Sequence, residues 1–195
     1  MQSEATLEQE NRADVLDLIL RRRSLRAFSS EPLTKNQVDI LFEAARWAPS
    51  SVNEQPWEYL YALRGEDLWT TILGTLNESN RVWAKEAPLL VVSLARTTFT
   101  RNGRPNHSAQ YDLGAANALL SIQATAMGLN VHQMGGYDRD ALREALHVPA
   151  DREPGVVMAI GFPGDANQLP DALREREHLP RFRKPVADFV KNEPF

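Results

Sequence analysis

Two continuous apolar segments constrain the fold of this chain more than any other feature. Residues 88–95 (PLLVVSLA) and 155–162 (GVVMAIGF) lack the polar–apolar alternation of a strand with one face in water. Uninterrupted apolar strands are typical of sheets that are covered on both faces. We therefore expect a sheet whose buried strands are covered by helices.

The segments around these strands carry helix patterns with defined ends. Thr34 and Gln37 form a capping box, Asp138 is placed as an N-cap, and Gly128 supplies a left-handed helix end. Helices are expected at residues 12–22, from 35 to before Pro49, within 66–86, at 109–129, and from 139 to about 147.

Strands alternate with these helices. They are expected at residues 57–63, 88–95, 130–133 and 155–162. The alternation indicates a single α/β or α+β domain over residues 1–195. The tail at 163–195 is rich in proline, charge and aromatic residues but has no clear periodicity. Because the tail has no core of its own, we expect it to pack on another part of the protein.

Basic residues gather in two short segments. Residues 21–26 hold four arginines, residues 181–184 hold two arginines and a lysine, and neither segment has an acidic residue. The other 15 basic residues face 26 acidic ones, so the rest of the chain carries about −11. A nucleic-acid-binding protein needs a broad basic face, so this pattern favours one small anion. The alternative is that each segment is a solvated helix end, where the helix dipole favours cations.

The composition excludes several kinds of chemistry. The chain has no cysteine, so disulfides, thiolate metal sites and cysteine nucleophiles are absent, as is typical of the reducing cytoplasm. The longest apolar run, at 87–95, is too short to cross a bilayer. The polar, acidic first ten residues do not resemble a targeting peptide. We expect a cytoplasmic protein.

Catalytic motifs based on side chains are also absent. The chain contains no Gly-rich nucleotide loop and no G-x-S-x-G motif. Glu-x-x-His pairs at 144–147 and 175–178 have di-iron spacing, but Pro149 and Pro180 end both segments, so we expect no metal site. An anion site without an acid–base constellation is typical of an enzyme whose bound cofactor carries the chemistry.

Five motifs together resemble one family. RRSLRAF at 22–28 and APSSVNEQPWEY at 48–59 resemble the R-R-S-x-R-x-F and P-S-S-x-N-x-Q-P-W motifs of flavin-dependent nitroreductases. The resemblance continues through residues 112–129 (DLGAANALLSIQATAMGL), 135–138 (GGYD) and 180–185 (PRFRKP). Because the motifs keep the family's order and spacing over nearly the whole chain, the chain is identified as a member of that family.

The resemblance implies a fold and an assembly. The fold is an α+β, three-layer α-β-α sandwich with an antiparallel-rich sheet covered by helices. The assembly is an obligate homodimer that binds two FMN molecules at the subunit interface. The tail at 163–195 would be domain-swapped onto the partner, anchored by Phe182, Val186 and Phe189. Apolar residues in the tail and in the 109–129 helix fit this, since a lone domain would leave them partly exposed.

The resemblance also implies which residues bind the flavin phosphate. Arg22 and Ser24, with Arg23 beside them, would contact the phosphate and ribityl chain. Arg181 and Arg183 would close over the phosphate from the tail. Paired guanidinium donors suit phosphate oxygens, so this assignment explains both basic segments.

Other motif positions are expected around the flavin ring. Arg26 lies where the family places a cation near the N1 and O2 edge. Gly135 and Gly136 would offer backbone N–H groups toward N5 and O4, since glycine allows close approach. The full set of ring-contacting residues expected in addition is Met134 from the same chain and Pro49, Ser50, Ser51, Asn53 and Gln55 from the partner subunit.

Two positions bear on the substrate. Gly135 stands where better-known nitroreductases have a glutamate, which keeps the backbone donor but leaves the pocket less acidic and more open. Phe99, in the polar loop at 96–108, is a candidate substrate lid; the alternative is that it packs under its own loop.

The motif set predicts an FMN-dependent oxidoreductase. NAD(P)H would reduce FMN by hydride transfer, and a nitroaromatic, quinone or similar small acceptor would then take the electrons at the same face in a ping-pong scheme. Two alternatives remain open. One is a same-fold flavoenzyme with other chemistry, such as reductive dehalogenation, flavin fragmentation or dehydrogenation. The other is a non-catalytic flavin-binding protein.

Overall fold

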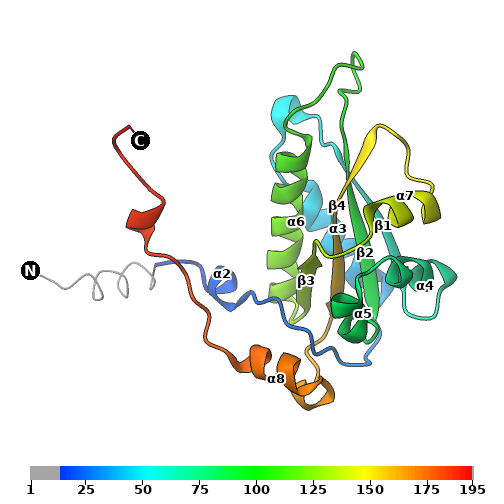
Figure 1. Ribbon diagram of the computed structural model, residues 1–195. Coiled ribbons are helices and arrows are strands. Elements are labelled where there is room, and N and C mark those ends of the chain that lie inside the picture. The colour runs from blue at the N-terminus through cyan, green and yellow to red at the C-terminus, as the bar shows by residue number, and fades with distance from the viewer. Residues whose placement is uncertain (1–13, 195) are drawn as a thin grey trace, which may run out of the picture.

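The computed structural model describes residues 14–194, in which four strands form a central sheet (Figure 1). Neighbouring strands pair antiparallel in the order β1-β2-β4-β3. The strands are β1 (Trp57–Leu63), β2 (Leu89–Arg96), β3 (Asn130–Met134) and β4 (Arg152–Gly161). Every predicted strand is present. The order places β1 and β3 at the two edges of the sheet.

The central strands β2 and β4 contain the two apolar segments. Residues 89–95 of β2 are all buried. Leu90 and Val92 enter the core on one side of the sheet, whereas Leu89 and Val91 enter the core on the other. Because side chains alternate along a strand, an apolar strand of this kind needs a cover on both faces.

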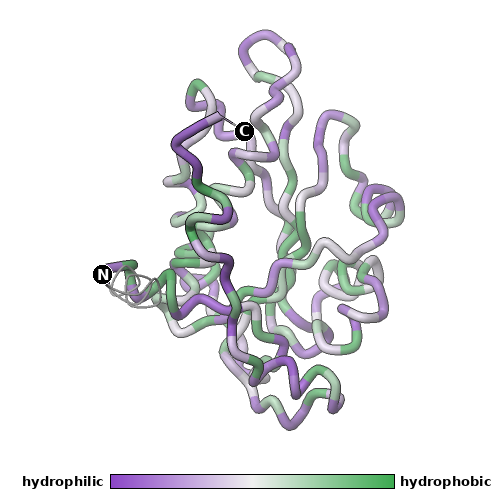
Figure 2. The backbone as a smooth tube through the Cα atoms, turned by 60° about the vertical axis from the view of Figure 1, so that its left-hand side comes forward, coloured by the Kyte–Doolittle hydropathy of each residue, from purple (hydrophilic) through white to green (hydrophobic). Residues whose placement is uncertain are grey.

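Helices supply that cover on both faces (Figure 1). On one face lie α3 (Lys35–Arg46) and α6 (Ala109–Ala126). On the other lie α4 (Asp67–Gly74), α5 (Glu78–Ala84) and α7 (Arg139–Ala145). The expected three-layer α-β-α sandwich is confirmed, and in Figure 2 hydrophobic colour runs along the central strands as well as over parts of the helices.

The predicted helix ends agree with the structure. Thr34 and Gln37 form the capping box of α3, and the Asp138 side chain accepts hydrogen bonds from two N–H groups at the start of α7. After α6, Gly128 adopts a φ of 74°, the left-handed conformation in which glycine carries no steric cost.

The N-terminal helix is shorter than the predicted 12–22. The helix α2 spans Asp17–Arg21, and the predicted start at residue 12 lies outside the described residues. None of its residues is buried, so tertiary packing does not offset the cost of nucleating so short a helix. Arg22 therefore lies just beyond the helix, with a non-helical ψ of 123°.

The tail contains a helix that the sequence patterns did not predict. The helix α8 (Asp171–His178) begins after Pro170 and buries only Glu177, so it has no apolar period to detect. From Leu179 to residue 194 every residue is exposed. Figure 1 shows this last segment leaving α8 and running beside α2, away from the sheet.

Three short 3-10 turns complete the described structure: η1 (Ser51–Asn53), η2 (Ala166–Gln168) and η3 (Val186–Asp188). Within residues 14–194, none of the helices combines the length and the hydropathy needed to cross a membrane.

Candidate functional site

The two basic segments lie side by side, although they are far apart in the chain. Arg181 donates from Nη1 to the Arg22 carbonyl at 2.7 Å and also donates to the Leu20 carbonyl. Arg23 donates from Nη2 to the carbonyls of Glu177, at 3.1 Å, and Leu179, at 3.2 Å. These bonds dock the tail onto the N-terminal segment. We call Arg22, Arg23, Arg26, Arg181 and Arg183 the arginine cluster.

Positive charges crowd one another inside the cluster. The pKa of Arg22 is lowered, first by burial and then by the nearby charge of Arg183. The Arg22 Nη1 also lies 3.4 Å from the Ser24 hydroxyl oxygen. The predicted residues Arg22, Ser24 and Arg183 are therefore close together. An anion bound here would relieve the repulsion and gain charge-assisted hydrogen bonds.

Arg26 lies at the inner end of the cluster, beside a buried carboxylate. Its backbone N–H donates to Glu177 Oε1 at 3.0 Å, and its Nη1 lies 3.5 Å from the same atom. Its guanidinium is 6.0 Å from the ring centroid of Trp83. Neither Glu177 nor Trp83 was predicted as part of the site.

His132 on β3 is hydrogen-bonded to the arginine segment 22–26 and was also not predicted. Its Nδ1–H donates to the Leu25 carbonyl at 3.1 Å, and its ring lies 4.5 Å from that of Trp83. Burial lowers the pKa of His132 to about 4, and the charges of Arg26 and Arg22 add to the effect against the hydrogen bonds that raise it. The imidazole is therefore neutral near pH 7.

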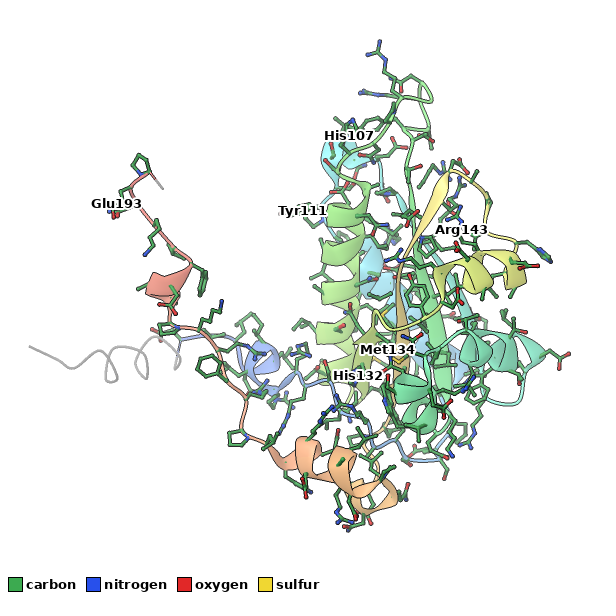
Figure 3. All side chains as sticks on the ribbon, in the orientation of Figure 1. His107, Tyr111, His132, Met134, Arg143 and Glu193 are labelled. Carbon is green, nitrogen blue, oxygen red and sulfur yellow. The ribbon has the colours of Figure 1, made fainter. Side chains whose placement is uncertain are left out.

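The strand β3 leads from His132 to the predicted glycine turn. Figure 3 shows His132 and Met134 on this strand. Met134 is 2% exposed and its side chain packs in the core, so the structure does not open this predicted side chain to a ligand. From His132 to Gly135 is three residues, or about 10 Å of extended chain. Edge strand β3 thus connects the arginine cluster with Gly135 and Gly136.

The glycine turn is fixed by two asparagines. The Gly136 carbonyl accepts hydrogen bonds from the Asn77 backbone N–H at 3.1 Å and from Asn80 Nδ2 at 3.0 Å. A Cβ at position 136 would lie 2.7 Å from Asn80 Nδ2, so a side chain there would displace Asn80. Within residues 14–194, neither the Gly135 nor the Gly136 N–H donates a hydrogen bond, which leaves both donors available.

The other group of predicted residues forms the 49–55 loop, whose backbone is unusual. Val52, Asn53 and Gln55 have φ values of 48°, 58° and 52°. Asparagine tolerates this left-handed region, but a β-branched residue such as Val52 is strained in it. Val52 is exposed, so its side chain gains little burial in exchange.

Contacts to the rest of the fold hold the 49–55 loop in place. The Ser51 N–H donates to Asp112 Oδ2 at 3.1 Å, and Asp112 is 3% exposed. Glu54 Oε1 accepts from the Thr100 N–H at 2.6 Å. Within the loop, the Gln55 N–H donates to Ser50 Oγ at 3.0 Å. Pro49, Asn53 and Gln55 are exposed.

The 49–55 loop and the arginine cluster do not meet within one chain. The loop contacts the first turn of α6, while α2 lies toward the other end of this helix (Figure 1). An 18-residue helix is about 27 Å long. One chain therefore connects the cluster with the glycine turn through β3 but leaves the 49–55 loop apart from both.

Within residues 14–194, two hollows border parts of this region, and one of them reaches the cluster at Arg26. One, of about 410 Å³, is bordered by Arg139 and Glu153. Another, of about 370 Å³, is bordered by Arg26, Lys85 and Leu169.

Phe99 is half-buried and packs with its own loop. The Phe99 N–H donates to the Arg104 carbonyl at 2.8 Å, and the Arg101 guanidinium lies 5.5 Å from the ring centroid. A role as substrate lid stays a prediction.

Comparisons with known proteins show which family the chain resembles. A model of the nitroreductase family matches residues 19–162. A crystal structure described as an oxidoreductase containing FMN is 36% identical, covers 93% of this chain and 92% of its own, and has a TM-score of 0.88.

Two relatives extend the comparison. A protein of Methanothermobacter thermautotrophicus, provisionally named NADH dehydrogenase/NAD(P)H nitroreductase, is 26% identical over 179 residues, covering 88% of this chain and 90% of its own. Iodotyrosine deiodinase of Drosophila melanogaster is 24% identical over 189 residues, covering 82% of this chain and 66% of its own.

Proposed function

Since the chain belongs to the nitroreductase family, we propose that it is an FMN-dependent oxidoreductase that uses NAD(P)H to reduce small acceptors such as nitroaromatics or quinones. The observation that carries the proposal is the arginine cluster, in which the tail docks onto the N-terminal segment. The FMN-containing oxidoreductase that covers 93% of this chain supports the choice of cofactor.

The residues present fit FMN. A phosphomonoester carries up to two negative charges, and the cluster offers several guanidinium donors whose mutual repulsion an anion would relieve. At the other end of β3, the Gly135 and Gly136 N–H groups are unused donors within the described residues. A planar, hydrogen-bonding ring attached to a phosphate suits both ends.

The roles of the residues follow from their positions. Arg22, Ser24, Arg181 and Arg183, with Arg23 beside them, would hold the phosphate and ribityl chain. Arg26 would lie near the N1 and O2 edge of the ring. Gly135 and Gly136 would donate to its N5 and O4 side, and the partner's 49–55 loop would cover the opposite face.

The chemistry belongs to the cofactor. When bound, FMN supplies a two-electron carrier that accepts a hydride from NAD(P)H and passes electrons to the acceptor. The chain's own groups orient the ring, neutralise the phosphate and exclude water. None of them is required as a nucleophile or a general acid.

A homodimer is part of this proposal. Tyr111 and Leu119 on α6 are 81% and 36% exposed, and in the tail Phe182, Val186 and Phe189 are 77%, 62% and 64% exposed. These exposed apolar side chains favour a second subunit that would bury them. Sedimentation should give a dimer at micromolar concentration, and a stable monomer would rule the dimer out.

The absorbance spectrum of the purified protein is the first test. We expect a flavin band near 450 nm that is bleached within minutes when NADH or NADPH is added without oxygen, and that returns when a quinone or nitroaromatic follows. A protein that stays colourless after FMN is added would refute flavin binding. A bound flavin that neither nucleotide reduces would refute the reductase and leave the carrier alternative.

Reductive dehalogenation is the second candidate, favoured by the similarity to iodotyrosine deiodinase. It shares the FMN site with the first proposal. Product analysis after anaerobic incubation with a halogenated tyrosine, a nitroaromatic and a quinone would separate the two: halide release from the tyrosine without reduction of the other two compounds supports the dehalogenase.

A further inference from the structure

Glu177 is a buried carboxylate at the edge of the arginine cluster. It is 7% exposed, the lowest exposure of any acidic residue in the described part of the tail. A buried carboxylate is costly unless it is paired and hydrogen-bonded. The pairing comes from Arg26, whose backbone N–H lies 3.0 Å and whose Nη1 lies 3.5 Å from Oε1.

The charges around Glu177 are unequal. The cluster contains five arginines, and among residues 14–194 Glu177 is the acidic side chain that hydrogen-bonds to the segment 22–26. Arg22 lies by another cation, Arg183, which lowers the Arg22 pKa together with burial. Glu177 therefore offsets the charge of Arg26, the arginine to which it is hydrogen-bonded.

We propose that Glu177 is a positioning residue that holds Arg26 and offsets its charge, and thereby limits how strongly the site favours the reduced form of bound flavin. The inference rests on the proposed function, in which Arg26 lies beside the ring. Reduction adds negative charge to the ring, and a nearby unpaired cation would favour that state. Because charges interact more strongly in a partly buried site than in water, pairing Arg26 with Glu177 has a measurable effect.

A purely structural role makes a different prediction. Glu177 also helps to dock the tail, since its backbone carbonyl accepts a hydrogen bond from Arg23 Nη2 at 3.1 Å. Glutamine at position 177 keeps the backbone carbonyl and an oxygen acceptor for the Arg26 N–H but removes the negative charge. If docking of the tail were the whole role, E177Q would change stability and leave the flavin potential unaltered.

The test measures the midpoint potential of bound FMN in the wild type, E177Q and E175Q, against a reference dye and without oxygen. Glu175 lies on the same helix but is exposed, so E175Q makes the same change in net charge away from the cluster. We expect E177Q to shift the ratio of reduced to oxidised flavin about tenfold toward the reduced form, which is about 30 mV for a two-electron couple. E175Q should stay within about twofold of the wild type.

The outcomes separate the inference from the proposed function. A wild-type protein that binds no FMN overturns both. A wild type that binds FMN, with E177Q at the same potential, overturns the inference alone, as does an equal shift in E175Q. If E177Q does not fold, E177D replaces it: its carboxylate is one methylene farther from Arg26, so a shift of the same sign but smaller is expected, and no shift overturns the inference.

Discussion

The arginine cluster and the 49–55 loop are both expected to contact the cofactor, yet the chain builds them in opposite ways. The cluster joins distant segments: the hydrogen bonds of Arg181 reach carbonyls 159 and 161 residues away. The 49–55 loop has a strained local backbone that a buried side chain, Asp112, holds in place.

The difference concerns what each region needs in order to keep its shape. The cluster exists only while the tail is docked, and its cations repel one another until an anion arrives. The 49–55 loop takes its shape from the folded core and stores strain that the core maintains. We therefore expect a bound anion to stabilise the cluster and to leave the loop almost unchanged.

Acid should give the largest effect, on the cluster side. The pKa of His132 is lowered to about 4 by burial, so between pH 6.5 and 4 the unfolded chain binds the extra proton and the folded chain does not. The free energy of unfolding should fall by about 3 kcal/mol as the pH drops through this window, with no further loss from this group below it. Urea unfolding of the wild type and H132Q at several pH values measures this. Equal pH dependence in the two proteins would contradict it.

Loss of Arg22 should weaken FMN binding next most strongly. A charge-assisted hydrogen bond contributes about 1.5–3 kcal/mol, so R22Q should raise the FMN dissociation constant roughly 10- to 100-fold. Arg21 is the matched control, because it is exposed and paired with Asp17. Fluorescence quenching of FMN gives both constants, and similar values for R22Q and R21Q would remove Arg22 from the site.

Removing the support of the 49–55 loop should cost less. D112A leaves the Ser51 N–H without its acceptor, and we expect a loss of about 1.5 kcal/mol in the free energy of unfolding. Q110A, at an exposed position two residues earlier on α6, is the control. If both variants unfold at the same denaturant concentration, Asp112 does not fix the loop.

Relieving strain in the 49–55 loop should give the smallest effect, and with the opposite sign. Glycine adopts the φ of 48° at position 52 without steric cost, so V52G should stabilise the protein by about 1 kcal/mol after the entropic cost of glycine is counted. V52A removes the branch but keeps a Cβ, so it should recover less. A V52G protein no more stable than V52A would show that the backbone is not strained there.

Much of the fold could be predicted because its signals are local. The apolar runs of β2 and β4, the capping box at Thr34 and the glycine at 128 each act within a few residues, and the structure confirms them. The helix α8 gave no signal, because Glu177 is its single buried residue. The length of α2 was overestimated, since its apolar side chains find no core within the described chain.

In the candidate site, too, local signals could be predicted and long-range contacts could not. The two basic segments were visible in the sequence, and the structure places Arg181 against Arg22. His132 and Glu177 were missed because their partners, Leu25 and Arg26, are 107 and 151 residues away. No spacing within either segment indicates such a contact, and only the folded chain reveals it.

Docking of the tail onto Leu20 and Arg22 also sets an order of events during synthesis. Those two residues leave the ribosome early, but their partner at position 181 is made 161 and 159 residues later. At roughly 5–20 residues per second, this is a delay of about 8 to 30 s. The sheet and most of its helices can assemble in that interval, so a nascent chain completes most of its fold before the arginine cluster can form.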